Sequence, residues 1–518
     1  MHFEDAGPFR PLAADVSALP GILRERGFTS AALTELGVLS TSSKRDLPLH
    51  ERFFRAGGGG DLELLARLFV LAREEEEAAV ERVLAPLGVG PLVVSGLLVR
   101  AEGGRVRASA AVIPVAELTM VREFYPSVTG KEHGEVEVLP VGRASVIAGL
   151  LAPREAGQRV LDLGCGQGVQ MVLASAHASR VVGTDVSAKS LNFAAMNLAL
   201  NRPPREVGAG PLKTEVRLGS VFEPVVDLKG SIDLIVSNPP FVITPERGKV
   251  AFSAEMEGDA IVERIVSGAP EHLAEGGWCV TLGSWIHQNQ SDFSDRPTAW
   301  ASGKGCDVLV GRFTTYTPRD YAIHWLQEFG QGKDFTAETM ENWTAYYQRL
   351  GAGAISYGFI ALRKRSAARL GNWSDAVSAS LDVNGGTAGD GLRRLFAART
   401  LLHGAAAGGG VTGSMAERDA ILGARLKLSP TAELRTRSKI IDEQWGCVEA
   451  KLVETRGFSA SVDVSQELSQ VLSICDGDLT LGQIITLVAR QGDLDREELA
   501  RSVLPKVREL LGDGMLAV

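Results

Sequence analysis

A glycine-rich turn between an apolar strand and a helical stretch is the feature that most constrains this chain. The segment VLDLGCGQG, residues 160–168, leads into Gly164, Gly166 and Gly168, and the helical stretch VQMVLASAHA follows at once. Glycine lets the backbone turn tightly and lets a ligand approach the main chain closely. The turn therefore predicts a ligand site at the end of a buried strand.

Short apolar strands alternate with helical stretches over residues 136–366. The predicted strands lie at residues 159–166, 180–187, 214–222, 232–240, 278–286 and 355–365. Such alternation is typical of a parallel sheet that is covered by helices on both faces. We therefore expect an α/β, Rossmann-like doubly wound domain, with a helical insertion at about 315–350 before its last strand.

Two carboxylates narrow the class of ligand. Asp162 precedes Gly164 by two residues, where a carboxylate suits a cationic ligand better than a pyrophosphate. Asp185 ends the next predicted strand, where a carboxylate accepts hydrogen bonds from both ribose hydroxyls. Val169 takes the third glycine place of a dinucleotide fingerprint, and the turn lacks the lysine of a GxxxxGK[ST] loop. A nucleoside without phosphates fits these residues, so the cofactor we expect is S-adenosylmethionine.

On these residues the region 136–366 resembles the class I methyltransferases. The resemblance implies that Ser220 bonds the adenine where an acid is more common. It also implies that Phe222 packs near the adenine, although plain core packing explains Phe222 nearly as well. The predicted cofactor-binding residues are Asp162, Gly164, Cys165, Gly166, Gly168, Asp185, Val186, Ser220, Val221, Phe222 and Asn238.

The sequence Asn238-Pro239-Pro240-Phe241 follows the fourth predicted strand, at the edge where such sheets bind ligands. Two prolines remove two N–H donors, so backbone carbonyls are left facing the cleft beside the Asn238 oxygen. Together they can accept both hydrogens of an NH₂ group, while Phe241 stacks on its flat face. We interpret these four residues as catalytic, because they orient a planar nitrogen and stabilise its developing charge without a general base.

Joined with the glycine turn, NPPF resembles the motif of N-methyltransferases that act on glutamine amides and on exocyclic base amines. The layout is most similar to the release-factor glutamine methyltransferases of the HemK type, and the small-domain methyltransferases of ribosomal RNA guanine are close relatives. The resemblance implies that residues 138–151 fold over the methionine end of the cofactor, with Arg143 and Ser145 in reach. HemK-type enzymes end after the catalytic domain, whereas this chain continues, so their substrate is not carried over.

Residues 1–135 are predicted to form a helical domain that ends in a hairpin. Residues 65–88 place apolar side chains on one helical stripe, so we expect the acidic run Glu74–Glu77 to lie on the solvated side of that helix. A hairpin is predicted around Gly103 and Gly104. Helices followed by a two-stranded wing resemble a winged-helix module.

Residues 367–518 are predicted to form a mostly helical accessory domain that serves substrate recognition. Its last sixty residues or so read as three short helices and a terminal strand, and they weakly resemble the PqqD-like winged-helix modules. That resemblance implies peptide binding along a strand edge. A basic stretch just before them is the best candidate for contacting phosphates, if its charges share one face. Its basic residues are Arg425, Lys427, Arg435, Arg437 and Lys439.

Composition limits the partners and the compartment. The formal net charge of −9 disfavours bulk nucleic-acid binding. The five cysteines form no CxxC pair, so we expect reduced thiols and neither a disulfide framework nor a metal site. No apolar run is long enough for a membrane span, and the first residues do not read as a secretory signal. We therefore expect a cytoplasmic protein without a membrane partner.

Three functions compete on these observations. We favour an S-adenosylmethionine-dependent N-methyltransferase that acts on a planar nitrogen of a protein or peptide, such as a glutamine amide, because of the acidic charge and the peptide-binder-like C-terminal segment. An RNA or DNA exocyclic-amine methyltransferase stays open, because NPPF permits it equally. A non-catalytic cofactor-binding scaffold is the third hypothesis, and the presence of Asp162, Asp185 and NPPF argues against it.

Overall fold

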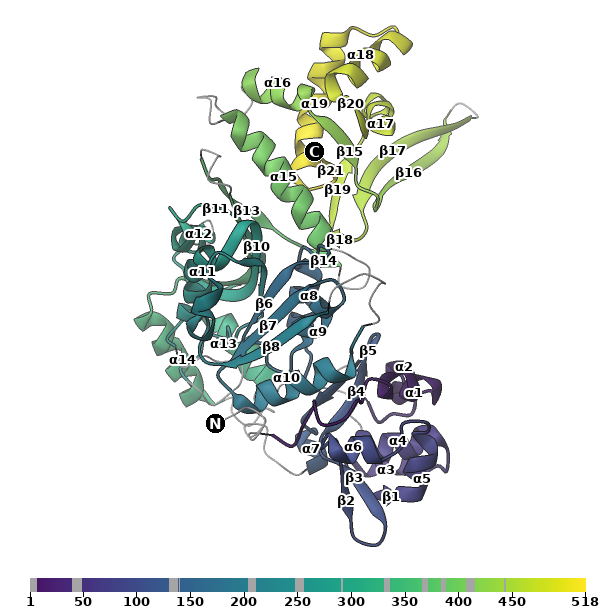
Figure 1. The fold of residues 1–518 in the computed structure, drawn as a ribbon. Helices are drawn as coiled ribbons and strands as arrows, with labels where there is room; N and C mark the ends of the chain where they lie inside the picture. The colour runs from purple at the N-terminus through teal and green to yellow at the C-terminus, as the bar shows by residue number, and fades with distance from the viewer. Residues whose placement is uncertain are drawn as a thin grey trace.

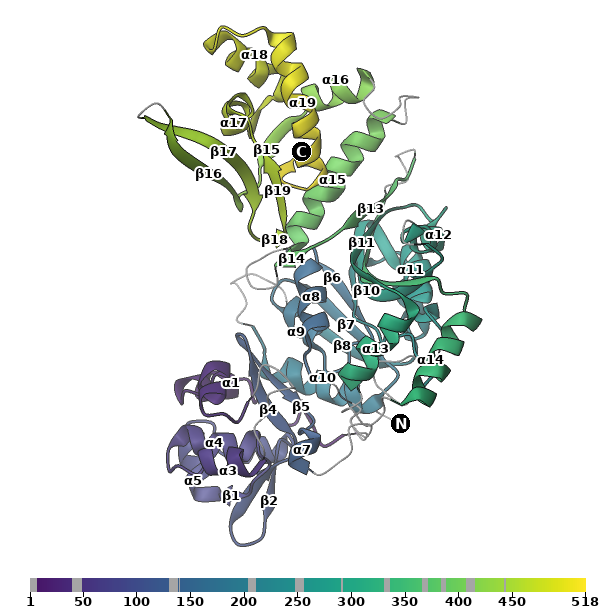
Figure 2. The ribbon, with the colours of Figure 1, turned by 180° about the vertical axis from the view of Figure 1, so that it is seen from behind.

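An eight-stranded sheet forms the centre of the protein (Figure 1). Figures 1 and 2 show the N-terminal elements at one end of this sheet domain and the C-terminal elements at the other. The computed structural model describes residues 7–39, 49–129, 138, 140–203, 211–246, 256–289, 292–329, 336–365, 371–382, 388–406, 415–441 and 444–518.

The central sheet has the strand order β13-β11-β12-β10-β9-β6-β7-β8. Its strands, in chain order, are β6 (Arg159–Leu163), β7 (Arg180–Asp185), β8 (Lys213–Leu218), β9 (Ile232–Ser237), β10 (Leu273–His287), β11 (Cys306–Tyr316), β12 (Ala354–Lys364) and β13 (Ser374–Ser378). Strands β6 to β10 run parallel, and β12 is antiparallel to both β10 and β11. The order reverses between β6 and β9, which is where a doubly wound sheet opens a crevice for ligands.

Helices cover both faces of the sheet. They are α8 (Arg143–Leu151), α9 (Val169–Ser175), α10 (Ala188–Leu200), α11 (Ala260–His272) and α12 (Asp295–Ala301). Gly183 of β7 faces Met171 of α9, whereas Gly283 of β10 faces Val262 of α11. The strand registers place these two glycines on opposite faces, so α9 and α11 lie on opposite sides of the sheet. The predicted Rossmann-like doubly wound fold is confirmed.

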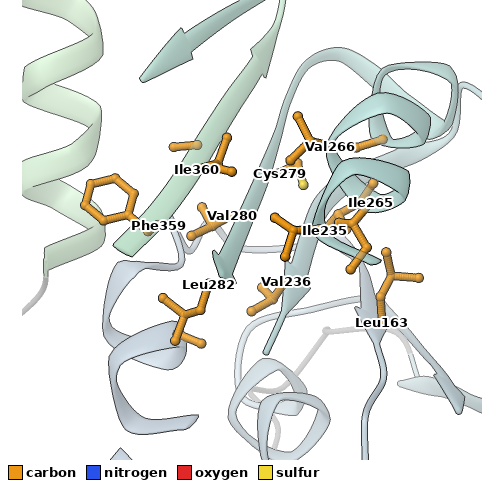
Figure 3. Close-up of a cluster of buried hydrophobic side chains, with 14 of the residues drawn as sticks. Leu163, Ile235, Val236, Ile265, Val266, Cys279, Val280, Leu282, Phe359 and Ile360 are labelled. Carbon is orange, nitrogen blue, oxygen red and sulfur yellow. The ribbon is translucent and has the colours of Figure 1, made fainter. Parts of the chain in front are cut away.

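Continuous apolar runs in the central strands build the main hydrophobic core. Val236, Val280 and Ile360 come from three different strands and are almost fully buried (Figure 3). Ile265 and Val266 of α11 pack on this cluster from the helix layer. These strands show no alternation of polar and apolar residues, which is typical of strands that are buried on both faces.

The predicted insertion is present, but the sheet is larger than the sequence indicated. Helices α13 (Pro318–Phe329) and α14 (Ala337–Arg349) lie between β11 and β12, close to the predicted range. Strand β11 was not predicted. Strand β13 pairs with β11 and lies beyond residue 366, so the sheet takes a strand from the region that we assigned to the C-terminal domain.

The N-terminal elements are helices with two short hairpins. The helices are α1 (Leu19–Glu25), α2 (Ser30–Glu35), α3 (Leu49–Arg55), α4 (Asp61–Phe69), α5 (Glu77–Val83), α6 (Gly90–Val94) and α7 (Pro126–Thr129). The strands are β1 (Glu75–Glu76), β2 (Leu98–Ala101), β3 (Arg105–Ala108), β4 (Ala111–Val115) and β5 (Leu118–Arg122). The hairpin at Gly103 and Gly104 is confirmed as β2–β3, and both glycines have a positive φ.

The acidic run does not lie on one helix face, contrary to our expectation. The chain leaves helix α4 at Phe69, forms β1, and begins α5 at Glu77. Glu75 pairs with Arg67 at 2.6 Å and Glu77 pairs with Arg100 at 3.0 Å. The run is therefore a set of ion pairs that join the helices to the hairpin.

The C-terminal region mixes helices and strands. Its helices are α15 (Ala388–Ala406), α16 (Met415–Gly423), α17 (Gln466–Ser473), α18 (Leu481–Gln491) and α19 (Arg496–Gly512). Its strands are β14 (Leu381–Asp382), β15 (Arg425–Leu428), β16 (Ala432–Ile441), β17 (Gln444–Glu454), β18 (Gly457–Phe458), β19 (Ala460–Asp463), β20 (Asp476–Thr480) and β21 (Leu516–Ala517).

The predicted closing helices α17 to α19 and a terminal strand are present, and helices outweigh strands in this region, but it also contains strands that were not predicted. Strands β16 and β17 form a long hairpin, and β19 adds a third strand to it. Arg435, Arg437 and Lys439 occupy alternate positions of β16, which is a strand period rather than a helix period. Among the described residues, no helix is long and apolar enough to cross a membrane.

Candidate functional site

A cavity of about 1430 Å³ lies at the carboxyl ends of β6, β7 and β9. A small-molecule site usually takes roughly 300–1,000 Å³, so this cavity has room for a nucleoside and for a second reactant beside it. Of the residues predicted from the sequence, those in its lining are Asp162, Gly164, Cys165, Gly166, Asp185, Val186, Ser220, Val221, Asn238, Pro239, Pro240 and Phe241. Arg143 and Ser145 of α8 also line it, as the resemblance implied.

The glycine turn forms the floor of the cavity. Gly164 and Gly166 have φ of 68° and 52°, a left-handed backbone that glycine adopts without strain. The Cys165 N–H donates to the Thr184 carbonyl at 2.9 Å, which fixes the turn to β7. The main chain of the turn is therefore held firmly and remains open to a ligand.

Gly168 is a predicted cofactor contact that lies outside the cavity lining. It stands at the N-terminus of α9 with a φ of 81°. A Cβ atom at this position would come within 2.8 Å of the Ala194 side chain of α10. The structure thus explains this glycine by the close approach of the turn to α10 and by its left-handed backbone.

Asp185 connects the end of β7 to the glycine turn. One carboxylate oxygen accepts the Gly166 N–H at 2.9 Å and the other accepts the Ser187 N–H at 2.8 Å. Burial raises the pKa of Asp185 above its ordinary value, and the backbone hydrogen bonds oppose that shift. Each oxygen keeps a further lone pair for a ligand hydroxyl. Val186 follows at the cavity with 72% of its surface exposed.

Asp162 is the most deeply buried acid of the site. Its side chain is 1% exposed, and its Oδ2 atom has no hydrogen-bond partner among the described residues. Burial, and secondly the negative charge of Asp185, raises the pKa of Asp162 to about 8. A buried oxygen without a partner is costly, so this acceptor is available for a donor from a ligand.

Gly219, Ser220 and Val221 form the third side of the nucleoside half. Val221 lines the cavity with a φ of 51°, which is rare for a β-branched residue and stores backbone strain. Phe222 is not in the cavity lining. Its ring stacks on His272 of α11, with 4.3 Å between the ring centroids. The core-packing interpretation of Phe222 therefore fits the structure better than the adenine contact.

The NPPF segment faces the cavity with one free acceptor. The Asn238 amide nitrogen donates to the Ser145 hydroxyl at 3.1 Å, which orients the side chain. The Asn238 Oδ1 atom is buried and has no hydrogen-bond partner among the described residues. Phe241 stacks on Tyr357 of β12, with ring centroids 5.2 Å apart. Asn238 thus presents an unsatisfied oxygen beside an aromatic wall.

Two tyrosines of the helical insertion support this segment, and the sequence did not predict them. The Ile243 N–H donates to the Tyr321 hydroxyl of α13 at 3.2 Å. The Tyr347 hydroxyl of α14 donates to the Ile243 carbonyl at 2.9 Å. Both tyrosines are fully buried. The signal in the sequence was the density of aromatic residues in this segment, which we predicted only as a helical insertion.

The other half of the cavity is largely aromatic. Tyr316 stacks on His324 of α13, with ring centroids 5.3 Å apart, and Trp325 meets Phe241 edge-on. The lining residues that the sequence did not predict include Phe313, Tyr316, His324, Trp325, Glu328, Tyr357, Ser380 and Leu381. Ser380 and Leu381 lie in the connection to the C-terminal region, so that connection forms part of the wall.

The basic stretch shares a face only in part. Arg435, Arg437 and Lys439 point to one side of β16, because they occupy alternate positions of the strand. Arg435 pairs with Glu433 at 3.1 Å and Arg437 pairs with Glu449 at 2.9 Å. Much of the positive charge is therefore compensated by acids of the same hairpin.

No group of three or more potential metal ligands occurs among the described residues.

Three family models match separate parts of the chain. The model of the "Methyltransferase small domain" matches residues 144–284, which contain the glycine turn, Asp185 and NPPF. Residues 26–109 and 413–518 match two domains of unknown function, DUF7059 and DUF7782. The predicted resemblance of the central region to the small-domain methyltransferases is confirmed. The winged-helix and PqqD-like resemblances stay predictions.

Several curated methyltransferases are similar to the central region. The ribosomal protein uL3 glutamine methyltransferase of Bradyrhizobium diazoefficiens is 34% identical over 28% of this chain and 46% of its own length. The ribosomal RNA small subunit methyltransferase C of Alcanivorax borkumensis is 29% identical over 36% of this chain and 49% of its own. The release factor glutamine methyltransferase of Neisseria gonorrhoeae is 28% identical over 32% of this chain and 61% of its own. The chain thus spans about half the length of these relatives, and both predicted subgroups, glutamine and small-domain methyltransferases, are represented.

Proposed function

We propose that this protein, whose central region carries a methyltransferase small domain, is an S-adenosylmethionine-dependent N-methyltransferase that acts on a planar nitrogen of a protein or peptide. One observation carries the proposal: the buried Oδ1 atom of Asn238 lacks a partner among the described residues and lines the cavity. An unsatisfied buried acceptor suits a ligand that brings an N–H donor, and an amide NH₂ group does so.

The residues around the glycine turn fit the proposed cofactor. Asp185 offers free lone pairs for the ribose hydroxyls, and the turn at Gly164 and Gly166 lets the nucleoside approach the main chain. The partnerless oxygen of Asp162 suits the ammonium group of the methionine part. When bound, S-adenosylmethionine supplies an electrophilic methyl group.

The chain's own residues orient the nitrogen and exclude water. The Ser145 hydroxyl fixes the Asn238 amide, so that its oxygen accepts one N–H of the substrate. Pro239 and Pro240 bring no N–H groups that would compete for this acceptor. Phe241, backed by Tyr357, presents a flat face to a planar group. Positioning and electrostatic stabilisation of the nitrogen are the contributions that these residues make.

The charges of the cavity favour a protein substrate over a polyanion. Among the described residues, the acids and bases of its lining are Asp162, which is mostly protonated at pH 7, and Asp185 and Glu328 against Arg143. A net negative lining repels phosphates, and the basic face of β16 is partly neutralised by its own acids. The C-terminal region serves substrate recognition in this proposal, because its connection supplies Ser380 and Leu381 to the cavity wall.

An exocyclic amine of RNA is the second candidate. The similarity to a ribosomal RNA small subunit methyltransferase favours it, and the aromatic half of the cavity could stack a base. Methyl transfer into a cell extract decides between the two. The purified protein is incubated with S-adenosylmethionine labelled at the methyl group and with extract from cells that lack the protein. The product is then digested with protease or with nuclease.

We expect the label to become acid-soluble after protease treatment and to remain acid-insoluble after nuclease treatment. We also expect the initial rate to change less than about threefold between 50 and 200 mM salt, because a protein substrate releases few counterions. Nuclease-sensitive label, together with a rate that falls steeply with salt, would replace the protein by RNA. Absence of any transfer by a chain that still binds S-adenosylmethionine would leave the non-catalytic cofactor-binding scaffold.

Replacement of Asn238 by alanine tests the catalytic assignment. We expect Asn238→Ala to lower turnover by about 10²-fold or more, the scale of losing one positioned stabilising group, while the affinity for S-adenosylmethionine is retained. Calorimetry gives the affinity and the extract assay gives the turnover. Asp185→Ala, in contrast, should weaken the binding of S-adenosylmethionine. Phe222→Leu serves as the control that changes neither, and full activity of Asn238→Ala would refute its role.

A further inference from the structure

Three asparagines of α10 bind the main chain of the N-terminal region. Asn192 accepts the Phe9 N–H at 3.1 Å and donates to the Phe9 carbonyl at 2.9 Å. Asn197 makes the same pair of bonds with Val121, at 2.6 and 3.0 Å. Asn201, at the end of the helix, does so with Thr119, at 2.9 and 2.8 Å. Each side-chain amide thus bonds to a residue of the N-terminal region as a neighbouring strand would.

Asn197 differs from the other two because it also reaches the glycine turn. Its amide nitrogen donates to the carbonyl of Gln167 at 2.8 Å as well as to that of Val121. Gln167 lies between Gly166 and Gly168. The Asn197 side chain is fully buried. One buried NH₂ group therefore joins strand β5 of the N-terminal region to the loop that forms the cavity floor.

Packing follows the same route. Met120 of β5 is buried against Val169 and Val172, the first residues of the helix that the glycine turn leads into. Gly168 of the turn lies against Ala194 of α10. The turn, α9 and α10 thus pack together, and strand β5 of the β4–β5 hairpin packs against α9. Figure 1 shows that hairpin beside α10.

We propose that Asn197 is a positioning residue through which the N-terminal region sets the conformation of the glycine turn and, with it, the affinity for the cofactor. The proposal rests on the proposed function only in naming S-adenosylmethionine as the ligand. Its physical basis is the shared donor. If the amide is lost, the carbonyls of Gln167 and Val121 lose the donor that they share, and the turn relaxes toward conformations that replace these bonds.

The experiment compares Asn197→Ala with Asn192→Ala and Asn201→Ala in the full chain. All three variants remove a paired amide–backbone contact with the N-terminal region, but only the first removes a bond to the turn. Affinity for S-adenosylmethionine is measured by calorimetry. Hydrogen exchange of the turn amides, at Cys165, Gly166 and Gly168, is measured without any ligand. The melting temperature is recorded for each variant.

We expect Asn197→Ala to weaken cofactor affinity by about tenfold or more and to speed exchange of the turn amides by a similar factor, the scale of one buried carbonyl left without its donor. Asn192→Ala and Asn201→Ala should lower the melting temperature and leave both readouts near the wild type. If Asn197→Ala does not fold, Asn197→Ser replaces it, since a hydroxyl cannot serve both carbonyls. Equal behaviour of all three variants in both readouts would overturn the proposal.

The two proposals fail in different ways. A wild-type chain that binds no S-adenosylmethionine would remove the proposed cofactor. The exchange of the turn amides would still report on Asn197, because that measurement uses the chain alone. Turn exchange that responds only to Asn197 would then support the positioning role, and turn exchange that ignores Asn197 would refute it.

Discussion

At the residue scale, two buried oxygens of the site, on Asp162 and Asn238, have no hydrogen-bond partner in the part of the chain that the structure describes. Native proteins seldom leave such atoms without partners, because each costs roughly 1–3 kcal/mol. Both residues line the cavity, and in the proposed function Asp162 faces the cofactor while Asn238 faces the substrate nitrogen. The same chain therefore offers one acceptor to a cation and one to a neutral N–H group.

The raised pKa of Asp162 predicts a pH-dependent cofactor affinity. Burial raises the pKa of this carboxyl to about 8, so it is mostly protonated at pH 7 without a ligand. A bound ammonium group favours the carboxylate, so binding releases a proton. The affinity should therefore rise by about tenfold between pH 6 and pH 7. It should level off near pH 8, where the α-amino group of the ligand begins to lose its proton at about 7.7–8.0.

Calorimetry in two buffers of different ionisation enthalpy measures the proton released at pH 7. Asp162→Asn should bind more weakly and release little or no proton. A wild-type affinity that stays constant between pH 6 and pH 7 would contradict this account of Asp162.

Most site residues could be predicted because each follows a strand end that the sequence marks by its own chemistry. Gly168 and Phe222 lie outside the cavity, and the reason is three-dimensional. Gly168 is needed for its approach to α10, and Phe222 turns toward His272 of α11. Tyr321 and Tyr347 were missed because each acts through a hydrogen bond to Ile243, which lies 78 residues from Tyr321 and 104 residues from Tyr347 in the chain. Long-range hydrogen bonds of this kind leave no local pattern.

At the scale of elements, the insertion between β11 and β12 does more than cover the site. Helices α13 and α14 each supply a tyrosine hydroxyl to Ile243, two residues after Phe241. Both polar groups of one buried peptide residue are therefore satisfied by the insertion. The insertion also contributes His324, Trp325 and Glu328 to the cavity. The position of NPPF and the shape of the proposed substrate half thus depend on the same pair of helices.

Loss of one tyrosine hydroxyl should separate turnover from cofactor binding. Tyr347→Phe leaves the Ile243 carbonyl without its donor, at a cost of about 1–3 kcal/mol. We expect turnover to fall by about tenfold, because NPPF loses support, while affinity for S-adenosylmethionine is unchanged. Tyr346→Phe is the matched control, since this neighbour on α14 bonds Gly258 rather than Ile243. Equal losses of turnover in both variants would refute the specific role of Tyr347.

The parallel strands of the sheet were predictable, and two outer strands were not. Strands β6, β7, β9 and β10 are apolar runs that end in turn residues. Strand β11 carries Asp307 near its start and Arg312, Thr314 and Thr315 in its second half, so it does not read as a buried strand. Asp307 is tolerated there because it pairs with Arg365. Strand β13 is short and half-exposed, and only its pairing with β11 defines it.

At the scale of the whole molecule, the catalytic region is not separable at the boundary that the sequence indicated. Strand β13 extends the central sheet, and α15 packs on the same core through Leu392, Leu395 and Phe396. The Phe396 ring meets Trp278 of β10, with ring centroids 4.7 Å apart. The first half of α15 therefore belongs, by its contacts, to the core of the central sheet.

Truncation tests this division. A chain that ends at residue 366 lacks β13 and α15, and it exposes the core that Leu392, Leu395 and Phe396 cover. At about 1.5–3 kcal/mol for each buried side chain, the loss approaches the whole stability of a typical domain. We expect this chain to be insoluble or molten by circular dichroism, and a chain that ends at residue 406 to melt cooperatively. Cooperative melting of the shorter chain at an unchanged temperature would contradict the assignment of α15.

The asparagine contacts of α10 have a consequence for how this protein can diverge. Toward the N-terminal region the three amides bind only N–H and C=O groups, so these bonds place no demand on the side chains of Phe9, Thr119 and Val121. The apolar contacts across the same junction do restrict substitution, because Phe9 packs on Phe193 of α10 and Met120 packs on α9. A foreign module grafted there would need a matching backbone path and apolar side chains at these contacts.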